Sequence, residues 1–138
     1  MTPSDATPMT ETEPHPLVRV ESLVLIAVGG FAGSNLRYFA SLLLPGLRGT
    51  LVANALGSFL LGFVLYERLF SDVLASETRA VLSTGFLSSF TTYSTFALQS
   101  AQSPPPVLVA NVVANYALGF AGVLVGRSVA RRVDGRWS

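Results

Sequence analysis

The sequence predicts an all-α membrane protein with four transmembrane helices. Of the 138 residues, 50% are hydrophobic and only 12% are charged, and the mean hydropathy is +0.52. A soluble domain usually carries about 25% charged residues. The apolar residues form four stretches near the ~20 residues that cross a bilayer as a helix. The chain is therefore too short to hold a large soluble domain beside its membrane part.

The composition divides the chain into three segments. Residues 1–20 contain four prolines and three acids before Glu21, which predicts a disordered acidic N-terminal tail. Residues 21–130 are predicted to form the four-helix transmembrane domain. Residues 131–138 hold Arg131, Arg132 and Arg136, and form a basic C-terminal tail beside the membrane.

The first predicted span runs from Ser22 to Leu44 and ends at Pro45-Gly46. Its unusual residue is Arg37. One interpretation is an arginine that reaches from the helix end to the membrane surface. The other is a cation at a pore mouth that attracts anions.

The second predicted span runs from Gly49 to Leu69, and Asn54 is the strong polar group well inside it. An asparagine in hydrocarbon must find a partner on another helix or face water. Its amide could donate to an anion, or it could serve as a structural hydrogen bond.

The third predicted span runs from Ala80 to Gln99 and contains the stretch from Gly85 to Phe96, in which six of twelve residues are Ser or Thr. Hydrocarbon cannot satisfy so many hydroxyls. We therefore expect this stretch to line a pore or site, or else to pack tightly against other helices. Consecutive Ser and Thr compete with the helix ladder, so we predict a break within residues 88–92.

The fourth predicted span runs from Val107 to Val129, after a proline-rich turn. Asn111 and Asn115 are four residues apart, so they lie on one face of this helix.

Several classes of function lack their usual residues. There is no Cys, and the single histidine, His15, lies in the polar tail, so a thiol or His-based metal site is not expected. No nucleophile–base pair or phosphate loop is present, so we predict no enzyme. The net charge of +1 gives no basic patch for nucleic acid.

From Ala27 to Gly126 the chain resembles the Fluc (CrcB) family of fluoride channels. The resemblance is carried by three stretches in order, which are Gly30-Phe31-Ala32-Gly33 with Arg37-Tyr38, Gly49 to Phe59, and Gly85-Phe86 with Thr91 to Phe96. It implies a fluoride-specific channel subunit that lets cytoplasmic fluoride leave passively, which lowers fluoride toxicity.

The resemblance also implies an assembly and a site. The family forms antiparallel dimers of four-helix subunits with fluoride pathways along the interface. A central Na⁺ would be held by the backbone carbonyls of Ser88 and Thr91. The resemblance assigns the fluoride pathway to Asn54, Tyr93, Ser94, Thr95, Phe96, Asn111 and Asn115, with Arg37 in the vestibule.

The chain departs from the family pattern at three places. The family often has two glycines where Ser88-Ser89 stand, a Phe where Tyr93 stands, and a Tyr where Asn111 stands. The departures keep polar or aromatic character.

The arginines predict one orientation in the cell membrane. Seven of the nine fall on the side that holds both termini and the connection between spans two and three, whereas Arg48 is in a loop on the other side. The positive-inside rule then places both termini in the cytoplasm. A homodimer of inverted copies needs almost no such bias, so we expect an oppositely oriented paralogue as partner, and otherwise a homodimer.

Two alternatives from other classes remain. One is a non-conducting partner or scaffold subunit of a heteromeric channel. The other is a small multidrug transporter, which would want a membrane carboxylate to exchange protons for its substrate. The sequence has no Asp or Glu between Ser22 and Tyr66, nor between Ala80 and Arg132, which argues against the transporter.

Overall fold

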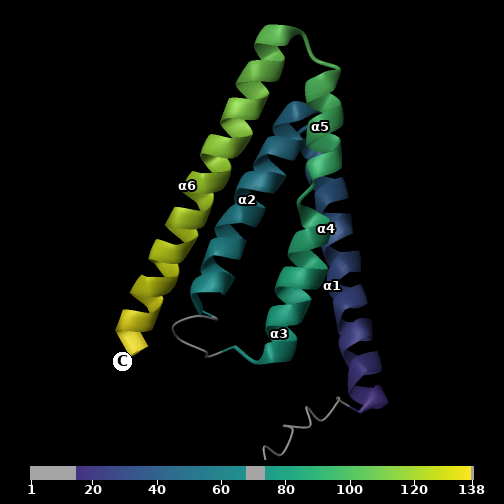
Figure 1. The fold of residues 1–138 in the computed structure, drawn as a ribbon, viewed down its shortest axis with the longest axis vertical. Coiled ribbons are helices and arrows are strands. Elements are labelled where there is room, and N and C mark those ends of the chain that lie inside the picture. Colours follow the sequence, from purple (N-terminus) through teal and green to yellow (C-terminus); the bar gives the residue numbers. More distant parts are fainter. Residues whose placement is uncertain (1–14, 68–73, 138) are drawn as a thin grey trace, which may run out of the picture.

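The structure is a computed structural model that describes residues 15–67 and 74–137. Its described residues are almost all helical, and the chain runs up and down between two ends (Figure 1). The helices are α1 (Pro16–Leu43), α2 (Leu47–Tyr66), α3 (Ser76–Ala80), the π-helix η2 (Val81–Leu87), α4 (Ser88–Phe90), α5 (Tyr93–Ala101) and α6 (Pro105–Trp137). The all-helical class predicted from the sequence is confirmed.

Helix α1 begins earlier than predicted. It starts at Pro16, so residues 16–20 are helical, although the sequence placed them in the disordered tail. The physical reason lies in the first turn, where proline fits because its missing N–H has no helical partner there. His15 caps the turn, since its Nδ1 accepts a hydrogen bond from the Leu17 N–H at 3.3 Å. The rest of the predicted tail, residues 1–14, lies outside the described residues.

Helix boundaries elsewhere follow the proline and glycine signals. Gly46, between α1 and α2, has a φ of 73°, which glycine adopts without steric cost. Pro104 precedes α6, which runs on through the predicted basic tail to Trp137. Helix α2 ends at Tyr66, whereas the predicted end at Leu69 lies outside the described residues.

Within residues 15–67 and 74–137, three helices are long and apolar enough to cross a membrane, namely α1, α2 and α6. The third apolar region is divided among α3, η2, α4 and α5, which follow one another along one line in Figure 1. The molecule is therefore a multi-pass membrane protein.

The four regions pack as two pairs. Helix α2 lies mainly against α6, and α1 lies mainly against η2 and α4. Glycines permit both contacts. A Cβ added to Gly126 would lie 2.0 Å from the Phe59 carbonyl oxygen, and one added to Gly33 would lie 2.3 Å from that of Phe86.

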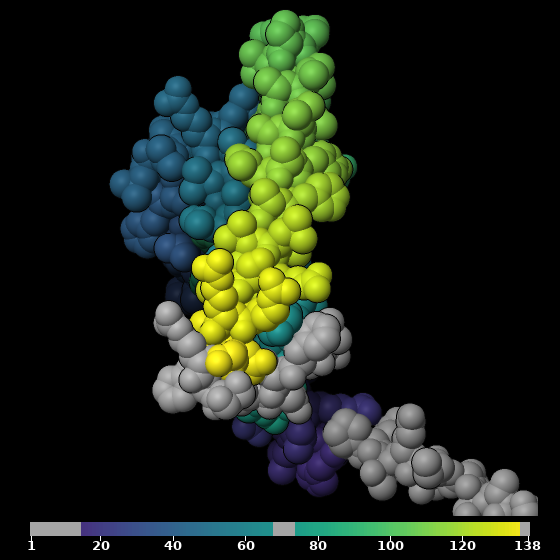
Figure 2. Space-filling model, turned by 90° about the vertical axis from the view of Figure 1, so that its left-hand side faces the viewer, coloured from purple at the N-terminus to yellow at the C-terminus, as the bar shows by residue number. Residues whose placement is uncertain are grey.

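Few apolar side chains are buried inside the chain. Those of the described residues are Ala53, Val64, Leu87, Phe90, Phe96 and Ala130. Large side chains such as Phe31 (74% exposed) and Phe120 (70%) face outward. Figure 2 shows α6 as an uncovered column along one side of the molecule. Such a surface suits lipid or another protein chain rather than water.

Candidate functional site

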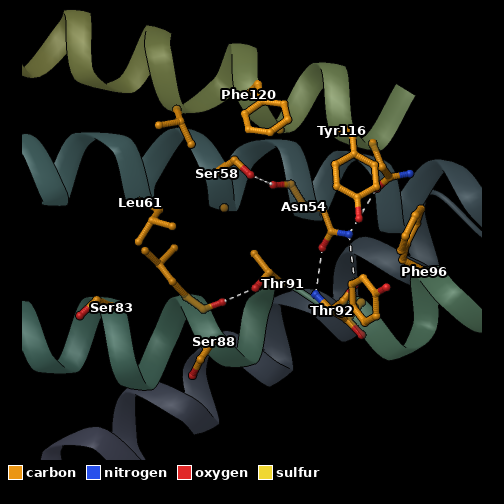
Figure 3. Close-up of a pocket in the computed structure, with 16 residues that line it drawn as sticks. Asn54, Ser58, Leu61, Ser83, Ser88, Thr91, Thr92, Phe96, Tyr116 and Phe120 are labelled. Carbon is orange, nitrogen blue, oxygen red and sulfur yellow. Dashed lines mark hydrogen bonds between the residues drawn. The ribbon is translucent and has the colours of Figure 1, made fainter. Parts of the chain in front are cut away.

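The candidate site is a groove between α2, α6 and the region from η2 to α5. Its volume is about 590 Å³. Figure 3 shows Asn54 reaching from α2 toward Thr92, with Tyr116 and Phe120 on the wall that α6 contributes. The groove therefore lies where the third apolar region is interrupted.

The helix is interrupted at Thr91 and Thr92. Helix α4 ends at Phe90, and the next two residues are extended, with φ/ψ of −78°/160° at Thr91 and −151°/123° at Thr92. Thr92 then caps α5, because its hydroxyl oxygen accepts a hydrogen bond from the Thr95 N–H at 3.2 Å. The Thr92 hydroxyl thus satisfies a backbone N–H that the new helix start leaves without a helical partner.

Asn54 bonds both backbone groups of Thr92. The Thr92 N–H donates to Asn54 Oδ1 at 2.9 Å, and Asn54 Nδ2 donates to the Thr92 carbonyl oxygen at 3.1 Å. Gly57, one turn along α2, lets the helices approach, because a Cβ there would lie 2.1 Å from Thr91 Cγ2. Helix α2 therefore holds the extended residues from the side.

A row of side-chain amides continues from Asn54 along α6. Asn54 Nδ2 donates to Asn115 Oδ1 at 3.3 Å, and Asn115 Nδ2 donates to Asn111 Oδ1 at 2.9 Å. Asn111 Nδ2 in turn donates to Ser100 Oγ at 2.9 Å. Asn111 and Ser100 are both 7% exposed, so this end of the row is buried.

Aromatic rings lie beside the amide row. The Phe96 ring centroid is 5.7 Å from that of Tyr93 and 6.3 Å from that of Tyr116, which meets Phe96 edge to face. The Tyr116 centroid is 6.5 Å from that of Phe120. Phe96 is buried at 7% exposure, whereas Tyr93 is 72% exposed. The groove thus combines amide groups with ring edges.

The structure brings most of the predicted site residues into this groove. The ones that line it are Asn54, Ser88, Thr91, Tyr93, Phe96 and Asn115. Asn111 lies behind the groove wall as a link in the amide row. The hydroxyls of Ser94 and Thr95 lie near the Thr92 hydroxyl, at 3.4 and 3.1 Å, instead of lining the groove.

Arg37 lies on the other side of the interruption. Its Nη1 makes a long contact of 3.5 Å to the Thr91 carbonyl oxygen, and its side chain is partly buried. The guanidinium is therefore directed at the backbone of the interruption rather than into the groove wall.

Sequence reasoning did not single out four residues that the structure adds to the site. Thr92 and Ser100 supply hydrogen bonds, and Tyr116 and Phe120 supply rings on α6. The signal available in the sequence was spacing, since Tyr116 and Phe120 are four residues apart and Tyr116 follows Asn115 directly. Nothing in the spacing connects Ser100 with Asn111 across the turn.

Backbone carbonyls at the interruption fit a small hard cation. In a continuous helix the Thr92 N–H would donate to the Ser88 carbonyl, but here it donates to Asn54. The freed Ser88 oxygen and the nearby Thr91 oxygen are neutral hard ligands of the kind that bind Na⁺ at broken helices. Ser88 and Thr91 therefore fit the predicted Na⁺ site chemically.

Comparison with known proteins gives one family. Residues 24–127 match the family model described as CrcB-like protein, Camphor Resistance (CrcB). A Haloarcula marismortui protein named Fluoride-specific ion channel FluC 1 is 62% identical over 121 residues, which cover 88% of this chain and 94% of that protein. The Halobacterium salinarum Fluoride-specific ion channel FluC 2 is 50% identical over 119 residues, covering 86% and 93% of the two chains. The Methanosarcina barkeri Fluoride-specific ion channel FluC 2 is 36% identical over 117 residues, covering 85% and 93%.

Proposed function

This chain belongs to the CrcB-like protein family, and we propose that it is a subunit of a fluoride-specific ion channel. The observation that carries the proposal is the 62% identity, over most of both chains, to a protein named as such a channel. The subunit lets fluoride leave the cytoplasm down its electrochemical gradient, and it thereby reduces fluoride toxicity.

The chemistry of the groove supports this proposal. Fluoride is small and holds its water tightly, so a pathway must replace that water with hydrogen-bond donors. Asparagine amides and hydroxyls are such donors, and the positive edges of aromatic rings also attract an anion. Phe96 and Tyr116 line the groove together with Asn54 and Asn115, and their two rings meet edge to face.

We further propose that the carbonyls of Ser88 and Thr91 hold a structural Na⁺. A bound cation lowers the cost of bringing an anion into a medium of low dielectric constant. Arg37 lies 3.5 Å from the Thr91 carbonyl, so its guanidinium would have to move aside for this carbonyl to hold the ion, because like charges repel. A vestibule role for Arg37 stays a prediction.

The assembly belongs to the same proposal. The chain crosses the membrane four times if η2, α4 and α5 together form the third crossing. The interruption at Thr91–Thr92 would then lie near the middle of the bilayer. The groove lies open on one side, with Tyr93 and Phe120 largely exposed. An antiparallel second subunit, either a paralogue or another copy, would close the groove and cover these rings. The channel lies in the cell membrane with both termini of this subunit in the cytoplasm.

The second candidate is a non-conducting partner subunit. Its support is that Tyr93 and Asn111 depart from the family pattern within the site, and that both N–H bonds of the Asn54 amide are already used. The multidrug transporter has less support, because α1 from Ser22 onward and α2 contain no Asp or Glu.

Fluoride efflux from liposomes tests the proposal. The purified chain is reconstituted alone and then with its candidate paralogue, and fluoride and chloride are followed with ion-selective electrodes. Fluoride-selective efflux in either sample supports a channel subunit, and efflux only with the paralogue supports a heterodimer. Absence of efflux from both samples, with protein that remains folded and dimeric, would favour the non-conducting subunit.

A further inference from the structure

The hydrogen bonds of Asn54 have a defined direction. A backbone N–H can only donate and a carbonyl can only accept, so the two bonds to Thr92 determine which end of the Asn54 amide is oxygen and which is nitrogen. The oxygen and nitrogen of an asparagine amide usually cannot be told apart without the hydrogen atoms. Here the Thr92 backbone distinguishes them, so the assignment does not need the hydrogen positions.

The direction is passed along the amide row. Asn54 must present nitrogen to Asn115, so Asn115 presents oxygen to Asn54 and nitrogen to Asn111. Asn111 consequently accepts from Asn115 through oxygen and donates to Ser100 through nitrogen. Each of the three amides therefore donates one N–H to the next member of the row, in the direction from the interruption toward Ser100.

Both N–H groups of the Asn54 amide are used in this arrangement. Its two N–H bonds go to the Thr92 carbonyl and to Asn115 Oδ1, and its oxygen accepts from the Thr92 N–H. A fluoride ion could bind this amide only after one of these bonds is broken. Asn54 is therefore better suited to holding the protein backbone than to binding the ion.

The bond to the Thr92 N–H has a consequence for the helix. The preceding amide, that of Thr91, keeps its helical bond to the Leu87 carbonyl at 3.0 Å. The helical hydrogen bonds stop one residue later. The Thr92 N–H donates to Asn54 Oδ1 in place of the Ser88 carbonyl. The release of the Ser88 carbonyl therefore coincides with the hydrogen bond that the Thr92 N–H donates to Asn54.

We propose that Asn54 is a positioning residue that produces the interruption at Thr91–Thr92 and thereby frees the Ser88 carbonyl for a cation. The cation part of this inference rests on the proposed channel function, whereas the backbone part does not. Asn115 only accepts the remaining N–H of Asn54, so the two bonds to Thr92, and not the rest of the amide row, hold the interruption.

Two unique dipeptides make the inference measurable. Ser88-Ser89 is the only Ser-Ser pair and Thr91-Thr92 the only Thr-Thr pair in the sequence. In full-length protein in lipid nanodiscs, labelling Ser or Thr with ¹³C at the carbonyl and ¹⁵N at the amide gives one carbonyl–nitrogen NMR correlation for each pair. The Ser pair reports the Ser88 carbonyl, and the Thr pair reports the Thr92 amide.

The decisive variant is Asn54→Leu. We expect the Ser88 carbonyl signal to move to the position of a hydrogen-bonded helical carbonyl, and to lose its response when Na⁺ is replaced by a bulky organic cation. Asn54→Asp keeps an acceptor for the Thr92 N–H, so its Ser88 signal should stay as in the unmodified protein. Asn115→Leu is the matched control, because it removes a neighbour of Asn54 but leaves both bonds to Thr92 possible.

An unchanged Ser88 signal in Asn54→Leu would overturn the inference, as would an equal change in Asn115→Leu. If Asn54→Leu does not fold, a measurement on the unmodified protein still tests the bond between Asn54 and Thr92. Labelling the Asn side-chain carbonyl carbon and the Thr amide nitrogen should then give a through-space contact at the Thr92 nitrogen, and its absence would contradict the inference.

Fluoride efflux measured on the same samples separates the two proposals. Efflux is expected to be lost in Asn54→Leu. The channel function alone would be refuted if the unmodified protein showed no efflux while the Ser88 signals of the unmodified protein and its variants changed as predicted above. Efflux that accompanies an unmoved Ser88 signal in Asn54→Leu would refute the positioning role alone.

Discussion

At the scale of single residues, the site is organised around the hydrogen bonds that polar side chains make to the backbone of the interruption. Thr92 is the centre, since its N–H and carbonyl bond Asn54 and its hydroxyl caps α5. Such bonds matter because an unpaired backbone group away from water costs about 1–3 kcal/mol. Within the hydroxyl-rich stretch of the sequence, Thr92 thus serves the interruption, and it also lines the groove.

We predict that Thr92→Ala lowers the free energy of unfolding by about 0.5–2 kcal/mol, because α5 loses the acceptor for its Thr95 N–H. Thr92→Ser keeps the hydroxyl and should restore most of the loss. Denaturant titration of the protein in detergent, followed by circular dichroism, gives the values. Ser128→Ala is the control, since the Ser128 hydroxyl only bonds the Leu124 carbonyl of its own helix. Equal losses in Thr92→Ala and Ser128→Ala would contradict the capping role.

We predict different effects on fluoride efflux from the two aromatic residues of α5. Phe96→Ile should reduce the rate at least about tenfold, equivalent to about 1.4 kcal/mol, because the ring edges beside Tyr93 and Tyr116 are lost. Tyr93→Phe keeps its ring and should conduct at nearly the original rate. The measurement is initial efflux from liposomes of equal protein content. Similar rates for Phe96→Ile and Tyr93→Phe would contradict a role for the rings.

At the scale of helices, backbone contact at glycines sets the distances on which the site depends. Gly57 admits Thr91 against α2, and Gly126 admits the Phe59 carbonyl against α6. Small residues at helix contacts are usual in membranes, because association there depends on close packing rather than on expelling water. The amide row spans α2, α5 and α6. The lengths of its hydrogen bonds therefore depend on how closely these helices pack at the glycines.

We predict that Gly126→Ala destabilises the protein by about 1–3 kcal/mol, since the new methyl would overlap the Phe59 carbonyl at 2.0 Å. The matched control is Gly135→Ala on the same helix, where no atom lies within 4 Å of the added Cβ. That control should be neutral or stabilising by up to about 1 kcal/mol, as alanine favours helix more than glycine does. Denaturant titration compares the two variants. Equal stability of both would show that the α2–α6 approach is looser than described.

At the scale of the whole molecule, the two ends of the helix bundle differ in the number of arginines that the described residues place there. The starts of α1 and α3 and the end of α6 share one end in Figure 1, and they carry Arg19, Arg79, Arg127, Arg131 and Arg132. Arg48 lies at the start of α2, at the other end. The helix arrangement thus gathers charges that are scattered along the sequence, and the positive-inside rule applies to the gathered set.

We predict that this subunit inserts in one orientation. The chain has no Cys, so single cysteines introduced as Gln102→Cys and Ala75→Cys report the two ends without background. A membrane-impermeant maleimide added to intact cells should label Gln102→Cys, and it should label Ala75→Cys only after permeabilisation. Equal labelling of both variants in intact cells would contradict a fixed orientation and favour a homodimer of inverted copies.

The sequence by itself determined the class of this protein, the approximate place of each apolar region and the family. The lengths of the apolar stretches are sufficient to predict the class and the places of the apolar regions. A chain in lipid must satisfy its backbone hydrogen bonds internally, so an apolar stretch of this length forms a helix. The family follows from polar and small residues at particular positions in three separate stretches. Local signals also indicated the region of residues 88–92, since hydroxyls compete with the helix ladder nearby in sequence.

Only the tertiary structure decided what the polar residues do. Asn54 and Thr92 are 38 residues apart, and Asn111 and Ser100 belong to different helices, so neither pairing is encoded in local spacing. The sequence left open whether Asn54 donates to an anion or makes a structural hydrogen bond, and its place in the fluoride pathway stays a prediction. The tertiary structure adds its two hydrogen bonds to the Thr92 backbone. The physical reason is that an amide bonds whichever donor and acceptor the packing of α2 and α6 brings within reach. That packing depends on the close contacts of Gly57 with Thr91 and of Gly126 with Phe59. Each contact joins two segments, so the sequence of one helix alone does not determine it.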